Sequence, residues 1–306
     1  MCLCRRSLIG RKNGYYQQRP ARKAHDREVL TNYVGELLQH DTSYHLWSPL
    51  AQTKWYLITT IDDHSRRILH GELWDKETTW THIMAQNAVL TQFGCPLKYY
   101  VDNHSIFRYV EKRDSVWRRF DTMEEQAVVQ WKEVLKDLSI EVVYALSPAA
   151  KGKVERPYQW LQDHLVRTCV REGITSIDQA RQVLYEELHQ YNYKRVHSTT
   201  GEIPVLRYEK ALEENRSLFR RFEIPRPYQT LDDIFCYRFK RTVDPYRKVS
   251  WNTLKFSLSG VPIREEVELR ISFNLKTRLA LIRFWYQDKL VGQQQVKAED
   301  LKKVHF

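Results

Sequence analysis

The amino-acid sequence predicts a mixed α/β domain built on a central sheet, followed by a small all-β barrel. Between residues 36 and 146, apolar runs of strand length alternate with segments of helical period, which is typical of helices packed on a sheet. From about residue 154 helical spacing continues, and beyond residue 230 short alternating runs dominate. Hydrophobic residues make up 42% of the 306 residues, enough for about two cores.

Turn and cap residues set the limits of these elements. Asp62-Asp63 separates the second and third strands, Gly94 ends a helix, and a short strand leads straight into Asp102. In chain order we expect strands over 36–47, 54–61 and 67–74, a helix over 78–93, a strand over 97–101, a helix over 124–138, a strand over 140–146, helices from about 154, over 177–194 and over 204–218, and strands over 234–242, 248–258, 267–271, 277–286 and 290–296.

The formal net charge is +11, and it is unevenly distributed. Residues 1–30 contain eight Lys or Arg and two acidic residues. Residues 31–150 contain 12 Lys or Arg and 16 acidic residues, and residues 151–306 again have a net positive charge. Basic flanks favour a polyanionic partner such as nucleic acid. A local excess of acidic residues between these basic flanks indicates functional carboxylates, for example ones that bind cations.

Composition also limits location and partners. No apolar run approaches the ~18 residues of a membrane span, and no apolar signal-peptide core opens the chain. We therefore expect a cytoplasmic protein with no membrane partner. Five scattered cysteines lack zinc-site spacing, so reduced buried thiols are the expected state.

Three carboxylates stand out by their positions. Asp41 lies inside the first strand, Asp102 ends the fourth, and Glu155 lies in the first turn of the helix after the fifth. If the first and fourth strands are neighbours, both aspartates converge at one edge of the sheet, within reach of Glu155. Clustered carboxylates repel unless cations neutralise them, and hard oxygen ligands suit Mg²⁺ or Mn²⁺. Two such ions can activate and stabilise the oxygens of phosphodiester chemistry.

Each carboxylate also has a structural alternative. An Asp at a strand end is commonly a turn or cap residue, and a Glu in a first helical turn favours the helix dipole. Asp41 is harder to explain structurally, because strand interiors normally reject Asp. Asp62 and Asp63 lie in a turn, where Asp is expected.

Five segments resemble one family. They are GELLQHDTSYHLW around Asp41, TTIDDHSRRILHGEL after it, KYYVDNHSIF around Asp102, SPAAKGKVERPYQWLQDHLV around Glu155, and YNYKRVHSTTGEIP. Together they resemble the transposases of bacterial insertion sequences that carry an integrase catalytic core, relatives of retroviral integrase and phage Mu transposase with an Asp-Asp-Glu triad. The resemblance covers about residues 31–210.

The resemblance implies an RNase H-like core with a mixed five-stranded sheet, which cuts DNA at element ends and joins the 3′-hydroxyl to target DNA. Asp41, Asp102 and Glu155 match the triad, with Asp41 bridging two Mg²⁺ or Mn²⁺ ions and the other two each completing one. A homo-oligomer on DNA is implied, because joining two ends needs two active sites. A bacterial, nucleoid-associated location is implied as well. The DNA contacts expected from the sequence are Lys151, Lys153 and Arg156 beside the triad, and Arg19, Arg22 and Lys23 in the N-terminal arm.

The expected domains are a basic arm over 1–30, a catalytic core over 31–218 and a DNA-binding barrel over 219–306. The arm is expected to be the remnant of an N-terminal DNA-binding module. An insertion over about 106–123 lengthens the interval between Asp102 and Glu155 to 52 residues. Two alternatives to a strand-transfer enzyme stay open: a transposase remnant that binds DNA without transposing, and an RNase H-like nuclease.

Overall fold

A mixed five-stranded sheet forms the centre of the N-terminal part of the chain. The computed structural model describes residues 31–102, 130–145, 152–251, 254–301 and 304. The strands are β1 (Leu37–His45), β2 (Trp55–Asp62), β3 (Ile68–Trp74), β4 (Lys98–Val101) and β5 (Glu141–Tyr144). Their spatial order is β3-β2-β1-β4-β5, and β1 to β3 are antiparallel while β4 and β5 run parallel to β1. The predicted mixed sheet is confirmed.

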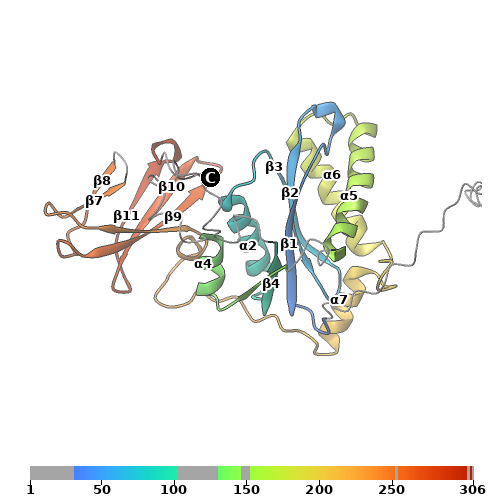
Figure 1. The fold of residues 1–306 in the computed structure, drawn as a ribbon, viewed down its shortest axis with the longest axis horizontal. Helices are drawn as coiled ribbons and strands as arrows, with labels where there is room; N and C mark the ends of the chain where they lie inside the picture. The colour runs from blue at the N-terminus through green and yellow to red at the C-terminus, as the bar shows by residue number, and fades with distance from the viewer. Residues whose placement is uncertain (1–30, 103–129, 146–151, 252–253, 302–303, 305–306) are drawn as a thin grey trace, which may run out of the picture.

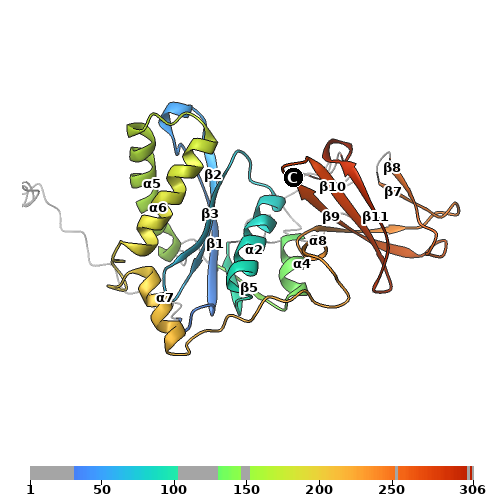
Figure 2. The same ribbon diagram turned by 180° about the vertical axis from the view of Figure 1, so that it is seen from behind.

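Helices cover both faces of this sheet (Figures 1 and 2). On one face lie α2 (Thr79–Phe93) and α4 (Gln130–Asp137), and on the other α5 (Gly152–Arg171), α6 (Ile177–Tyr193) and the shorter α7 (Pro204–Glu213). Successive residues of a strand point to opposite faces. The sheet thus has two apolar faces. Leu38 on β1 lies in the core beneath α2 and α4, and Leu57 on β2 lies in the core beneath α5 and α6.

Local sequence signals determine where the helices begin and end. Thr78 and Ser176 form capping boxes with the residues three positions later, which satisfy the first free N–H groups of α2 and α6. Gly94 ends α2 with φ 99°, and a Cβ there would collide with the carbonyl oxygen of Arg220. Only glycine fits this close crossing.

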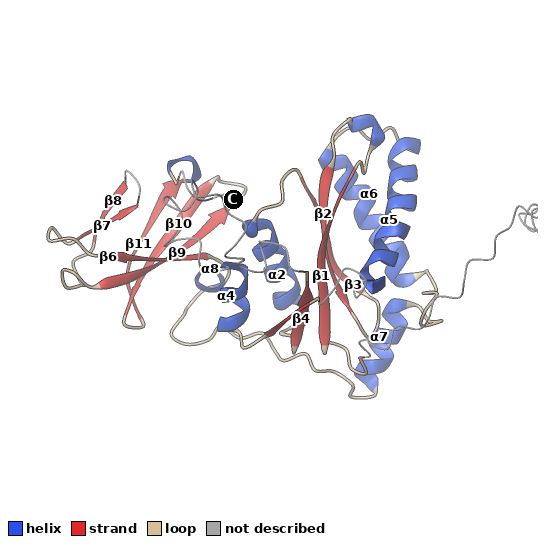
Figure 3. Cartoon of the chain, viewed as in Figure 1, coloured by secondary structure: helices blue, strands red, loops and turns tan. Residues whose placement is uncertain are grey.

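The C-terminal part is all-β but not a closed barrel (Figure 3). After the short α8 (Leu231–Ile234), the strands are β6 (Tyr237–Thr242), β7 (Lys248–Trp251), β8 (Leu254–Ser257), β9 (Glu266–Asn274), β10 (Leu279–Tyr286) and β11 (Lys289–Lys297). Four form a sheet in the order β11-β10-β9-β6, and β7 and β8 form a separate ribbon. The barrel prediction is wrong because, among the described residues, the edge strands β6 and β11 do not pair with each other.

Several boundaries also differ from the sequence prediction, and three of them change how the chain is organised. The run over 248–258 is two strands joined as the β7–β8 ribbon, and the run from residue 234 begins as a helix. Helix α7 ends at Glu213 rather than near residue 218, because Asn215 adopts φ 55° and the chain then extends beside the start of β1. There Leu218 donates its N–H to the carbonyl oxygen of Val34 at 2.8 Å.

The short 3₁₀ turns η1 (Pro49–Ala51) and η3 (Ala298–Asp300) complete the elements. No helix in the described part of the chain is both long and apolar enough to span a bilayer.

The two parts share one hydrophobic core. Trp80 of α2 packs against Tyr237 of β6 and Phe273 of β9, with ring centroids 5.7 Å and 6.4 Å apart. The side-chain amide of Gln130, at the start of α4, forms two hydrogen bonds with the backbone of Arg238. It accepts from the Arg238 N–H at 2.7 Å and donates to the Arg238 carbonyl oxygen at 2.8 Å. Burial of these large aromatic surfaces stabilises the contact between the two parts.

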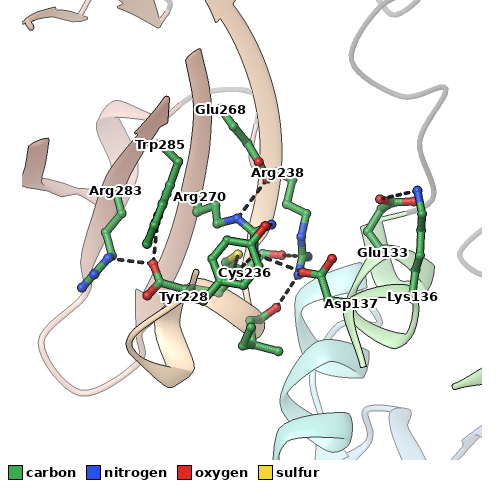
Figure 4. A network of polar contacts seen from close by, with 12 residues as sticks. Glu133, Lys136, Asp137, Tyr228, Cys236, Arg238, Glu268, Arg270, Arg283 and Trp285 are labelled. Carbon is green, nitrogen blue, oxygen red and sulfur yellow. Dashed lines mark hydrogen bonds and ion pairs between the residues drawn. The ribbon is translucent and has the colours of Figure 1, made fainter. Parts of the chain in front are cut away.

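A buried ionic network closes the same contact (Figure 4). Asp137, at the end of α4, accepts hydrogen bonds from Arg238 at 2.8 Å and Arg270 at 3.1 Å. The Arg270 guanidinium also stacks on the ring of Tyr228, 3.7 Å from its centroid. The side chains of Arg238 and Arg270 are only 7% and 2% exposed, and Asp137 compensates the charge of both. Glu268 also pairs with Arg270 at 2.9 Å.

Replacing Asp137 with Asn is expected to lower the free energy of unfolding by about 3 kcal/mol, because two buried guanidinium groups lose a charged partner. Urea unfolding followed by tryptophan fluorescence measures this. Glu133→Gln on the same helix is the matched control, since its partner Lys136 is 75% exposed and 3.8 Å away, and it should change stability by less than about 0.5 kcal/mol. Equal unfolding midpoints for the two variants would contradict the assigned role of Asp137.

Candidate active site

Two of the predicted site residues, Asp41 and Asp102, lie in or directly after neighbouring strands of the sheet. Strands β1 and β4 pair in parallel, with Leu37 opposite Lys98 and Gln39 opposite Tyr100. Continuing this register by two residues places Asp41 opposite Asp102, which directly follows β4. Both aspartates are half-buried. Residues opposite each other on adjacent strands share a face, so the continued register brings both side chains to the same face of the sheet.

Helix α5 is fixed against the sheet at this point by Tyr158. Its hydroxyl donates a hydrogen bond to the backbone carbonyl oxygen of Asp41 at 2.7 Å and lies 2.7 Å from Oγ1 of Thr59, the β2 residue paired with Asp41. One helical turn further along, Gln162 donates to Ser43 Oγ at 3.4 Å. The face of β1 that carries Asp41 is therefore the face covered by α5.

The pKa of Tyr158 is raised well above its usual value, first because the hydroxyl is buried and second because the Asp41 carboxylate is near. Both effects disfavour a phenolate. The Tyr158 hydroxyl therefore stays protonated at neutral pH and remains the donor that holds the backbone of Asp41.

Glu155 is the fourth residue of α5 and lies three positions before Tyr158. Its side chain is outside the described part of the structure, as are those of Lys153 and Arg156. Lys151, Arg19, Arg22, Lys23 and the predicted insertion over 106–123 lie wholly outside the described residues. In the described part of the chain, no group of three or more His, Cys, Asp or Glu residues could hold a metal ion.

The opposite face of β1 carries a polar chain that sequence reasoning missed. His40 Nδ1 lies 2.8 Å from Thr60 Oγ1, His40 Nε2 lies 2.8 Å from His82 Nδ1, and His82 Nε2 lies 3.1 Å from Glu77 Oε1. The His40 ring also stacks on Trp131, with centroids 5.8 Å apart. If ionised Glu77 accepts from His82, each imidazole donates through Nε2 and accepts through Nδ1.

These linked hydrogen bonds hold strand β1 in place at His40, the residue before Asp41. Both imidazoles are fully buried, so each needs the hydrogen-bond partners that it has. The sequence held one signal for this arrangement: successive side chains of β1 alternate between the two faces of the sheet, so His40 and Asp41 lie on opposite faces. The partner His82 lies 42 residues away and could not be identified from spacing.

Asp62 and Asp63 act as turn residues near the start of β1, away from Asp102. Asp62 accepts hydrogen bonds from the N–H groups of Gly35 and Ser65, both at 2.8 Å, and from the Ser65 hydroxyl at 2.6 Å. Burial raises the pKa of the Asp62 carboxyl. Asp63 forms an ion pair with Arg66 at 2.7 Å. Both carboxylates are thus engaged in holding the β2–β3 turn.

The sheet order and the helices on both faces (Figure 1) are those of an RNase H-like core, as the resemblance implied. No protein-family profile matches the chain. A protein of Sinorhizobium fredii named as a transposase, y4bF, is 30% identical over 178 residues, which are 58% of this chain and 37% of that protein. The transposase for insertion sequence IS1202 of Streptococcus pneumoniae is 30% identical over 174 residues, 56% of this chain and 35% of that protein.

These matches confirm the resemblance to insertion-sequence transposases. The matched segment spans little more than a third of the length of these curated relatives. Among solved structures, the magnesium-bound catalytic core of HTLV-2 integrase is 17% identical with a TM-score of 0.43 and covers 57% of this chain and 97% of its own. A chain of a simian T-cell lymphotropic virus intasome is 15% identical with a TM-score of 0.46. The match covers 97% of this chain and 92% of that chain.

One imidazole on β3 makes the free energy of unfolding depend on pH. His70 of β3 pairs with Thr60 of β2, and its Nε2 is buried with no hydrogen-bond partner in the described structure. Burial lowers the pKa of His70 from 6.5 to about 4. The folded protein therefore stabilises the neutral ring, and the unfolded chain takes up the proton first as the pH falls.

Stability is accordingly expected to fall between pH 6.5 and about pH 4, with His70 contributing about 2–3 kcal/mol of the loss. Urea unfolding at half-unit pH steps measures the slope. The His70→Gln variant should flatten the slope in this window, whereas His189→Gln, at an exposed position on α6, should leave it unchanged. A wild-type slope in His70→Gln would show that another group titrates.

Proposed function

We propose that this protein is a metal-dependent DNA strand-transfer enzyme of the transposase and integrase type. It would hydrolyse a phosphodiester bond at an element end and join the exposed 3′-hydroxyl to target DNA. The observation that supports the proposal is the parallel β1–β4 register, whose continuation by two residues would bring Asp41 beside Asp102. The 30% identity to two transposases over this segment supports it.

The donor set suits hard divalent cations. Asp41 and Asp102 bring two carboxylates to one place, and such a pair repels unless cations neutralise it. Together with Glu155 these residues would hold two Mg²⁺ or Mn²⁺ ions, with Asp41 shared between them. When bound, the ions would activate the attacking oxygen and stabilise the leaving oxygen.

The protein's own contribution would be placement. Tyr158 holds the backbone of Asp41 from one face of the sheet, and the chain from Thr60 through His40 and His82 to Glu77 holds β1 from the other. Because both supports are buried, the Asp41 carboxylate is presented in a narrow range of positions. Such preorganisation favours a reaction whose geometry must be exact.

DNA would be held through its phosphates by basic residues. Lys151, Lys153 and Arg156 lie close in sequence to Glu155, and Arg19, Arg22 and Lys23 belong to the basic segment over 1–30. We assign catalysis to residues 31–218 and additional DNA binding to 219–306. A homo-oligomer would supply two active sites for two DNA ends. Action on chromosomal DNA in the bacterial cytoplasm follows from this substrate.

The Asp102→Asn variant is expected to lose metal-dependent strand transfer by more than about a hundredfold, because a metal-binding carboxylate becomes a neutral amide. The assay uses labelled duplexes copied from the DNA that flanks the gene, with Mn²⁺, Mg²⁺ or EDTA, and separates cleaved from joined strands on a denaturing gel. Asp178→Asn, 84% exposed on α6, is the matched control and should retain wild-type activity.

Each product pattern has a distinct meaning. Cleavage without joining would indicate an RNase H-like nuclease instead. Salt-sensitive DNA binding without metal-dependent cutting would indicate a DNA-binding remnant. Wild-type cleavage by Asp102→Asn would show that this site is not catalytic. A loss of cleavage counts for the proposal when the variant unfolds at the wild-type temperature.

A further inference from the structure

The loop between β6 and β7 carries the most exposed aromatic ring in the described residues. Tyr246 is 81% exposed, more than any other large apolar or aromatic side chain there. The adjoining β7–β8 ribbon lies at the end of the molecule away from α5 and α6 (Figures 1 and 2). An aromatic ring left in water at such a position is available for a partner.

The backbone that carries Tyr246 is held by its own hydrogen bonds. Asp244 Oδ1 accepts from the N–H groups of Tyr246 at 2.9 Å and Lys248 at 2.8 Å. The Asp244 N–H donates to the Lys248 carbonyl oxygen at 2.8 Å, and Arg247 donates to the Asp244 carbonyl oxygen at 3.0 Å. Because the loop is already ordered, placing the ring against a ligand costs little conformational entropy.

Positive charge outweighs negative charge around the ring. Residues 241–266 contain five Lys or Arg and three acidic residues; the Asp244 carboxylate is engaged with the loop backbone, and Glu266 pairs with Lys240 at 2.7 Å. Lys255 is exposed on β8, opposite exposed Ser250 on β7. Arg264 donates its N–H to the Val243 carbonyl oxygen at 2.8 Å and is therefore beside the loop. The cations are Arg241, Arg247, Lys248, Lys255 and Arg264.

We propose that Tyr246 stacks on an unpaired nucleobase of DNA while the neighbouring cations bind the adjoining phosphates. A second copy of this protein would bring the same cations against them, so the charge disfavours self-association through this patch. A base within a duplex is already stacked on both sides, whereas an unpaired base offers a free face. The inference rests on the proposed function, in which processed DNA ends are the substrate, and names a contact remote from the carboxylates.

The test is DNA binding by fluorescence anisotropy in EDTA, with a blunt duplex and the same duplex carrying a three-nucleotide single-stranded overhang. Tyr246→Ala is expected to weaken binding of the overhang duplex about tenfold and of the blunt duplex less than twofold. Tyr246→Phe should keep wild-type affinity, since the ring is retained. Tyr185→Ala, at a 74% exposed tyrosine on α6, is the matched control and should bind both duplexes as the wild type does.

A spectroscopic readout separates stacking from general weakening. A 2-aminopurine placed in the overhang should be quenched by the wild type and by Tyr246→Phe, but not by Tyr246→Ala. Equal affinity of Tyr246→Ala and wild type for the overhang duplex would overturn the inference. So would an equal loss for both duplexes, or a failure of Tyr246→Phe to restore quenching.

The outcome is separable from that of the proposed function. Binding is measured without metal, so Asp102→Asn should show the same overhang preference as the wild type. If the preference depends on Tyr246 but no joining occurs, strand transfer fails and the inference stands. If joining occurs without any effect of Tyr246, only the inference fails. If the wild type binds no DNA, both are wrong.

Discussion

The parallel pairing of β1 with β4 is the constraint on which the candidate site depends. Strand β1 is antiparallel to β2 and parallel to β4, so it joins the two parts of the mixed sheet. A register shift of one residue would turn every side chain of β1 to the other face. Leu38 would leave the core, His40 would lose His82, and Asp41 would leave Asp102. The register that buries the apolar residues is thus the register that pairs the aspartates.

Much of this could be predicted from sequence because the signals are local. Alternation and turn residues located β1 to β5, and helical spacing located α5, whose Tyr158, Leu161 and Leu165 are buried in the core. Asp41 stood out because a strand interior normally rejects a carboxylate. The role of Tyr158 was hidden, since a buried tyrosine on an apolar stripe looks the same whether or not its hydroxyl has a partner.

What the sequence could not predict depends on contacts between distant residues. The strands beyond residue 230 were expected to close into a barrel, but they form an open sheet and a separate ribbon. Alternation shows that a strand exists, but not which strand pairs with its edge. The ion pairs of Asp137 join residues 101 and 133 positions apart. No periodicity links such positions. The available signal was a charged residue between apolar ones, as at Arg270 between Leu269 and Ile271 of β9.

The contact between the two parts bears on how DNA would be held. Helix α4, which carries Asp137, packs beside β5, and β5 pairs with β4, the strand that leads into Asp102. On the other side Arg238 and Arg270 belong to β6 and β9, and β6 continues into the loop of Tyr246. Ordered, buried contacts therefore connect the carboxylates to the exposed ring without a linker between them. A DNA molecule that engaged both would be positioned by the folded chain itself, which is the arrangement a single defined cleavage position requires.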